Sequence, residues 1–204
     1  MKMKIKQLSK IFLTYLFNWQ HIIRFKEIGK NVIIGKRTIT NFAGDGIFIG
    51  NNVRFGNDLR LSLYSSTVSQ KPKIVIKDNV YAGNHISLLT ASDIVIEEDV
   101  LMASYINILG ENHSMDPMAS LTYGKQPLIT APITIKKGSW IGQNVSILCG
   151  SKGITIGEKS IIGTGSVVTK SIPDFSIAVG NPAKVIKIFN FDSGSWEVVN
   201  ERIL

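Results

Sequence analysis

Apolar residues recur at every sixth position through much of this chain. A spacing of six matches neither the 3.6-residue period of a helix nor the two-residue alternation of a strand. It is typical of a chain that forms a short strand, turns a corner at a small residue and repeats, so that three sides close one coil of about eighteen residues. Twelve positions share this spacing, and all but Ala82 are Ile, Leu, Val or Met: Ile76, Ala82, Leu88, Ile96, Met102, Ile108, Ile135, Ile141, Ile147, Ile156, Ile162 and Val168.

A second marker, an apolar-x-Ile pair, is expected to open each coil. The sequence therefore predicts an all-β protein, a parallel β-helix of about six coils, and not a β-sandwich. We expect Gly142, Gly157 and Gly163 to adopt the backbone angles of tight corners, and Ser139, Ser160 and Ser166 to fit where the corner is narrow. The pairs are Val32/Ile34, Ile47/Ile49, Ile74/Ile76, Ile94/Ile96, Ile133/Ile135 and Ile154/Ile156.

Three segments lie outside the repeat. Residues 1–28 are expected to contain an amphipathic helix, from residue 3 to about 25, that packs on the β-helix or a neighbouring subunit, or lies on the inner face of a membrane. Residues 109–132 interrupt the coils at 29–188 as a projecting loop. The prism is expected to end at 169–173, and the tail 189–204, which includes Trp196 and Ile203, to cap the last coil.

Charge and cysteine content narrow the class of protein. The net charge of +8 favours an anionic partner, such as a phosphorylated cofactor or an anionic membrane, while no recognisable RNA-binding motif predicts a nucleic acid partner. Cys149 has no second cysteine to pair with, so we expect a reducing, cytoplasmic location. We expect no secretory leader, because the apolar residues of the basic N-terminus are interrupted and no small-residue cleavage site follows them. We expect no transmembrane segment, because no uninterrupted apolar run is long enough.

The projecting loop carries His113, one of three histidines in the chain. Long excursions from a regular scaffold often carry function. With this histidine, the hexad array and three short motifs resemble the hexapeptide-repeat acetyltransferases, and most of all the maltose and galactoside acetyltransferases and the O-acetyltransferases of surface polysaccharides. The motifs are Trp140-Ile141-Gly142, Val167-Val168-Thr169-Lys170-Ser171-Ile172-Pro173 and Gly180-Asn181-Pro182-Ala183-Lys184.

The resemblance implies a left-handed β-helix, a homotrimer, and acetyl-CoA bound in grooves between adjacent subunits, with no metal. It identifies His113 with the catalytic base and Trp140 with a residue lining the site. Gly83 replaces the acceptor-contacting Asn of the sugar acetyltransferases, which leaves Asn84 and His85 as acceptor-binding candidates, and the step at Ser151–Gly153 is longer than usual. The acetyl-CoA-binding positions that it implies are Trp140, Gly142, Thr164, Thr169, Lys170, Lys184 and Lys187.

The expected reaction is acetyl transfer from acetyl-CoA to a hydroxyl group of a sugar in a bacterial surface polysaccharide or its precursor. A neutral imidazole suits removal of the hydroxyl proton, so His113 is the expected general base, with Glu111 or Asp116 as candidates to orient its ring. Cys149, a conceivable nucleophile for a ping-pong route, is expected to be an apolar filler.

Three other functions remain open from the sequence. A nucleotide-sugar N-acetyltransferase of the same fold would use an amine acceptor. A γ-type carbonic anhydrase would bind zinc through histidines such as His85 and His113, and metal analysis would reveal it. A non-catalytic trimeric scaffold would not bind acetyl-CoA.

Overall fold

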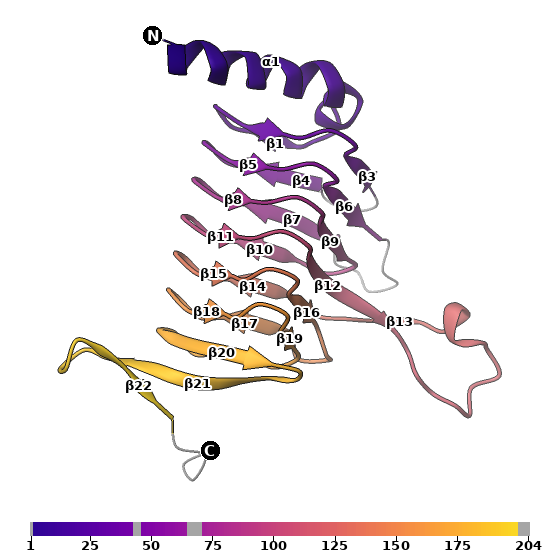
Figure 1. Ribbon diagram of the computed structural model, residues 1–204. Helices are drawn as coiled ribbons and strands as arrows, with labels where there is room; N and C mark the ends of the chain where they lie inside the picture. Colours follow the sequence, from indigo (N-terminus) through magenta and orange to yellow (C-terminus); the bar gives the residue numbers. More distant parts are fainter. Residues whose placement is uncertain (1, 43–45, 65–70, 200–204) are drawn as a thin grey trace.

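The computed structural model describes residues 2–42, 46–64 and 71–199 of this chain. It is a three-sided β-helix whose coils stack below one N-terminal helix, α1 (Lys2–Ile22) (Figure 1). Three parallel sheets form sides that we name A, B and C, and each coil contributes one strand to each side in that order. The prediction of a β-helix with about six coils is confirmed.

On every side, the coil strands stack in the order in which they occur along the chain. Side A consists of β1 (Glu27–Ile28), β4 (Gly46–Ile49), β7 (Lys73–Ile76), β10 (Ile94–Ile96), β14 (Ile133–Ile135) and β17 (Ile154–Ile156). The coil strands of side B are β2 (Ile33–Ile34), β5 (Arg54–Phe55), β8 (Tyr81–Ala82), β11 (Leu101–Met102), β15 (Trp140–Ile141) and β18 (Ile161–Ile162). Side C consists of β3 (Ile39–Phe42), β6 (Arg60–Leu63), β9 (Ile86–Thr90), β12 (Ile106–His113), β16 (Ser146–Leu148) and β19 (Val167–Val168).

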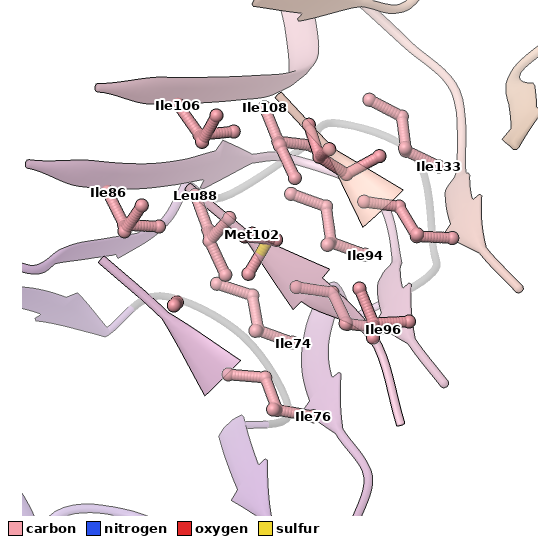
Figure 2. Packing of buried hydrophobic residues seen from close by; sticks show 14 of the residues in the cluster. Ile74, Ile76, Ile86, Leu88, Ile94, Ile96, Met102, Ile106, Ile108 and Ile133 are labelled. Carbon is pink, nitrogen blue, oxygen red and sulfur yellow. The ribbon is translucent and has the colours of Figure 1, made fainter. Parts of the chain in front are cut away.

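The inward side chains stack in columns along the prism axis. Ile74, Ile94 and Ile133 occupy equivalent positions of successive coils, because their strands pair in register (Figure 2). All twelve positions of the six-residue spacing are buried. Apolar burial of this extent supplies the main stabilising free energy of the coil. The residues at the six-residue spacing are therefore core residues.

The first coil begins earlier than the apolar pairs predict. Strand β1 pairs with β4, so coil one opens at Glu27–Ile28 on side A. The pair Val32/Ile34 overlaps β2 and belongs to side B, and its interpretation as a coil opening was wrong. Lys26 is level with Ile47, since its N–H donates to the Ile47 carbonyl at 2.9 Å. Lys26 and Ile28 thus correspond to the pair Ile47/Ile49, and because the first of them is a lysine, the apolar-x-Ile pattern does not detect this opening.

The corners differ from the expectation based on glycine. Left-handed backbone angles fall mostly on Asn, Asp and other non-glycine residues, which include Asn31, Asn52 and Asn79, and the glycines that adopt them, such as Gly138 and Gly165, are not the three predicted ones. Asn tolerates this conformation better than most residues, and these three side chains form a ladder, with Nδ2 of Asn31 3.0 Å from Oδ1 of Asn52. Gly142 serves a different purpose, because a Cβ there would lie 2.7 Å from the Ile162 carbonyl oxygen. Glycine at this position allows close stacking of coils and is not needed for the turn.

The small corner residues were predicted correctly. Ser139, Ser160 and Ser166 are fully buried. Each hydroxyl donates to a backbone carbonyl, for example that of Ser139 to Lys136 at 2.6 Å and that of Ser166 to Gly163 at 2.7 Å. Because each buried hydroxyl has a partner, the narrow corner accepts a polar residue at little cost.

The prism continues past the point predicted for its end. Ile172 bridges to Ile156 on side A, and β20 (Ser176–Gly180) adds to side B in parallel with β18. The chain then reverses into β21 (Ala183–Asn190) and β22 (Ser195–Val198), which are antiparallel. Ala183 and Val185 of β21 pack against the core, so the covering strand begins before the predicted tail. Residues 200–204 of that tail lie outside the described residues.

The helix α1 lies across the open end of the first coil (Figure 1). Its Thr14 and Asn18 side chains are buried against β2, where Thr14 Oγ1 accepts the Ile34 N–H at 3.0 Å and Asn18 Nδ2 donates to the Gly35 carbonyl at 3.1 Å. These bonds satisfy backbone groups at an edge that has no further strand beside it. The predicted amphipathic helix is therefore confirmed, and it contacts the prism through a largely polar stripe.

Candidate active site

An arm projects from the fourth coil and carries His113 (Figure 1). Strand β12 runs past the corner between sides C and A and pairs there with β13 (Leu128–Thr130), so that His113 faces Leu128 at the end of this antiparallel pair. The side chain of His113 is exposed. Because two paired strands support it, this histidine is held at a fixed place outside the prism.

The segment beyond His113 folds back on itself through one buried amide. Gln126 follows a short helix, η1 (Tyr123–Lys125). Its Nε2 donates to the carbonyls of Asp116 at 2.9 Å and Leu121 at 3.1 Å, and its Oε1 accepts the Asp116 N–H at 3.1 Å. Gln126 was not predicted from the sequence, because a side chain that bonds to nearby backbone has no recognisable motif.

The two carboxylates considered as partners of the imidazole lie in different places. Glu111 is two residues before His113 in β12, and therefore on the same face of the strand. Asp116 instead accepts the Met118 N–H at 2.9 Å within a turn. Of the two carboxylates, Glu111 is therefore the better placed to orient the His113 ring.

Trp140 lies on the outer surface of side B. It is about half exposed, beside the buried Ile141, and aligns with Leu101 in the coil above and Ile161 in the coil below. Gly142 follows at the corner between sides B and C, and Thr164 lies exposed at the equivalent corner of the next coil. These three acetyl-CoA candidates thus form one group along side B and its corner with side C.

Asn84 and His85 lie at the same corner in the third coil. Oδ1 of Asn84 accepts the Asn57 N–H at 2.8 Å, so this side chain supports the coil stack. The His85 ring stacks on Tyr105 with centroids 4.5 Å apart, and its Nε2 lies 3.5 Å from Oδ2 of Asp58. The two residues border different surface hollows: Asn84 a groove of about 450 Å³ beside α1, and His85 one of about 380 Å³.

An ion pair that the sequence did not reveal completes the surroundings of His85. The guanidinium of Arg37 binds both oxygens of Asp58, from Nε and from Nη2, each at 2.6 Å. The hydrogen bond from Arg37 lowers the pKa of Asp58 below its usual range. Asp58 therefore stays ionised and presents a negative charge to the His85 ring.

The remaining predicted residues lie near the last coil. Thr169 and Lys170 are exposed directly after β19, where side C turns toward side A. Lys184 and Lys187 belong to β21 on side B. Gly180 to Lys184, which form one of the short motifs, make the turn between β20 and β21.

The candidate residues do not form one site within a single chain. His113 projects from the corner between sides C and A, and in a three-sided prism this corner is opposite side B, where Trp140 lies. His85 is level with Tyr105, the residue before β12, and His113 ends that strand, roughly 26 Å away along eight residues of extended chain. The predicted neighbours of the imidazole therefore meet it only if a second copy supplies them.

The same geometry bears on the zinc-binding alternative. Among the residues that the structure describes, no three His, Cys, Asp or Glu side chains are grouped so that they could hold a metal ion. Within one chain, His85 and His113 also lie too far apart to bind the same zinc ion.

Comparisons with known proteins agree on the class of protein. Residues 27–59 and 132–170 match the family described as the hexapeptide repeat of succinyl-transferase. WbbJ of Escherichia coli K12, named as an O-acetyltransferase of lipopolysaccharide biosynthesis, is 32% identical over 157 residues, which cover 74% of this chain and 76% of WbbJ. A Mycobacterium tuberculosis protein named as an acetyltransferase is 33% identical over 90% of this chain, but the match spans only 59% of that protein.

Solved structures share the fold. A serine-to-alanine mutant of AntD of Bacillus cereus, an N-acyltransferase solved with coenzyme A and dTDP-4-amino-4,6-dideoxyglucose, superposes with a TM-score of 0.70 at 24% identity, covering 86% of this chain and 90% of AntD. A maltose O-acetyltransferase of Clostridium difficile gives 0.58 at 26% identity, covering 90% and 86% of the two chains. The fold and the WbbJ match show that this chain belongs to the hexapeptide-repeat acetyltransferases, whose β-helix is left-handed.

Proposed function

We propose that this protein transfers the acetyl group of acetyl-CoA to a hydroxyl of a sugar in a bacterial surface polysaccharide or its precursor, in the cytoplasm. The observation that carries the proposal is His113, presented by the β12–β13 arm outside a prism of acetyltransferase type. The names of WbbJ and of the maltose O-acetyltransferase favour a sugar hydroxyl as the acceptor. The coenzyme A bound in AntD supports an acyl-CoA donor.

In this mechanism His113 acts as general base. Its neutral imidazole removes the proton of the acceptor hydroxyl while that oxygen attacks the thioester carbonyl carbon. The tetrahedral intermediate carries its negative charge on the former carbonyl oxygen, which backbone N–H groups or a side chain of the neighbouring subunit stabilise. When the C–S bond breaks, the imidazolium returns the proton to the departing coenzyme A sulfur, so no covalent enzyme intermediate forms.

The active site of this proposal lies between subunits of a homotrimer. The arm of one copy delivers His113 to side B of the next copy, where Trp140, Gly142 and Thr164 line the acetyl-CoA arm. The lysines of β21, Lys184 and Lys187, would attract the phosphates of coenzyme A. The separation of His113 from Trp140 within one chain supports this assembly, because a monomer cannot join them.

The test is the loss of turnover on removal of the imidazole. We expect His113→Ala to lower kcat by about 10²–10⁴-fold, while calorimetry still detects binding of acetyl-CoA. Met118→Ala removes an exposed side chain from the same arm and serves as the matched control, with kcat close to that of the unmodified protein. An unchanged kcat in His113→Ala would exclude the proposed base.

The acceptor class requires a separate experiment. The protein should acetylate glycan hydroxyl acceptors in a screen that also offers nucleotide-linked amino sugars, with the acetyl position read by NMR. Acetylation of the amine alone would replace the proposed reaction with nucleotide-sugar N-acetylation. Failure to bind acetyl-CoA at all would indicate a scaffold protein.

A further inference from the structure

One face of α1 is apolar and has no partner in the described part of the chain. Leu8, Phe12, Tyr15, Leu16 and Trp19 recur three or four positions apart, so they share one side of the helix. Their side chains are 43–66% exposed. We call these five residues the apolar face of α1. Contiguous exposed apolar surface of this kind marks a site of interaction.

The fold itself does not use this face. The helix is fixed to the prism by a different stripe, in which Thr14, Asn18 and Ile22 are buried. Thr14 and Asn18 bond to the backbone of β2 and the residue that follows it. Contact with the first coil therefore accounts for the buried stripe. It does not account for the five large apolar residues of the other face, three of which are aromatic.

The charge of the same segment indicates the chemistry of the partner. Residues 1–26 contain six basic residues and no Asp or Glu, and the first acidic residue is Glu27. Two copies that met through this face would bring like charges together, which is unfavourable. An anionic lipid surface instead offers compensating charge and an apolar layer in which the exposed side chains are buried.

The helix fits a position on the bilayer and not across it. No helix in the described residues is long and apolar enough to span a membrane. An amphipathic helix that is basic, and that carries aromatic and aliphatic residues along one face, lies in the plane of the interface. We propose that the apolar face of α1 docks this protein on a membrane surface that contains anionic phospholipid. This inference does not depend on the role of His113.

Vesicle sedimentation of the full-length protein tests the docking. The protein should pellet with vesicles of phosphatidylcholine containing phosphatidylglycerol, less with phosphatidylcholine alone, and less again at high salt. The combined variant Phe12→Gln, Leu16→Gln and Trp19→Gln should weaken binding by about 100-fold. The control variant Met115→Gln and Met118→Gln removes exposed apolar side chains from the arm instead, and should bind as the unmodified protein does.

Fluorescence provides a second measurement that needs no triple variant. The tryptophan emission maximum should shift to shorter wavelength when vesicles containing phosphatidylglycerol are added, and this shift should disappear in Trp19→Phe. An unmodified protein that stays in the supernatant, or a triple variant that pellets equally well, would overturn the proposal. A third outcome would also overturn it: the unmodified protein does not bind vesicles, and light scattering gives the triple variant a lower molecular mass than the unmodified protein. The apolar face of α1 would then join copies of the chain.

Discussion

At the scale of single residues, Cys149 decides between two chemical routes. The thiol is buried directly after β16, and burial raises its pKa. A raised pKa keeps the thiol protonated near neutral pH, whereas a nucleophilic cysteine needs the thiolate. The structure therefore favours direct transfer over an acetyl-cysteine intermediate, and Cys149 as a filler of the corner.

We predict that Cys149→Ala retains kcat within about twofold, because the side chain takes no part in the reaction. In the unmodified protein, the rate of alkylation by iodoacetamide should rise with pH around a midpoint above the value of about 8.5 for a free thiol. Steady-state kinetics and timed alkylation measure the two quantities. A fall in kcat as large as that expected for His113→Ala would contradict the prediction and restore the ping-pong route.

At the scale of elements, the position of the arm depends on a close contact at its base. β12 leaves the prism at Gly110, which is paired with Thr90 of β9. A Cβ at Gly110 would collide with the Thr90 hydroxyl, and that hydroxyl is already fixed by bonds of 2.9 Å to the N–H and the carbonyl of Ser92. The glycine therefore permits the strand to pass directly over a buried, immobile side chain.

We predict that Gly110→Ala lowers the free energy of unfolding by roughly 1–3 kcal/mol through this overpacking. It should also reduce kcat/KM, because β12 must move and carry His113 with it. Gly124→Ala is the matched control, since a Cβ there has no neighbour within 4 Å. Thermal unfolding and steady-state kinetics test both variants, and equal behaviour of the two would show that the contact does not matter.

The elements also show which features a sequence reveals. The coils were predictable because each inward residue packs against an equivalent residue of the next coil. The core positions therefore recur at a fixed spacing in the sequence. The first coil was misplaced because Lys26 stands where the apolar opening residue should be. Gln126 and the Arg37–Asp58 pair were missed because their partners lie at distances in sequence, 10 and 21 residues, that follow no motif.

The arrangement of the candidate site was predictable only in part, for a related reason. The motifs indicated candidate site residues, including His113 and Trp140. They contained no information on which corner or side each residue occupies, and therefore did not show that the prism separates the two. That relation depends on the order of sides around a coil, and it becomes visible only in three dimensions.

At the scale of the whole molecule, the two proposals place the chemistry relative to a membrane. α1 covers the first coil, and the arm leaves from the fourth (Figure 1). If the bilayer lies on the side of α1 away from the prism, three coil steps of about 4.8 Å and a helix about 10 Å wide put the base of the arm roughly 25 Å from the bilayer surface. A docked enzyme would therefore reach sugars that extend away from the lipid surface more readily than groups within it.

The assembly allows a test by complementation. If His113 of one copy works on side B of the next, the variants His113→Ala and Trp140→Ala damage opposite halves of each site. Co-expressed in equal amounts, they form mixed trimers in which about a quarter of the sites combine an intact histidine with an intact tryptophan. We predict about a quarter of the unmodified activity for the mixture, when each variant alone is nearly inactive.

The control mixes Trp140→Ala with the double variant that carries both substitutions. That mixture contains no chain with Trp140, so it must stay inactive if recovery depends on sites shared between copies. Activity of the first mixture that equals only the mean of its two components would mean that each chain builds its own site. Since side B and the arm of one chain lie on opposite sides of the prism, that result would require Trp140 to act away from the acetyl group, and the groove between copies would lose its support.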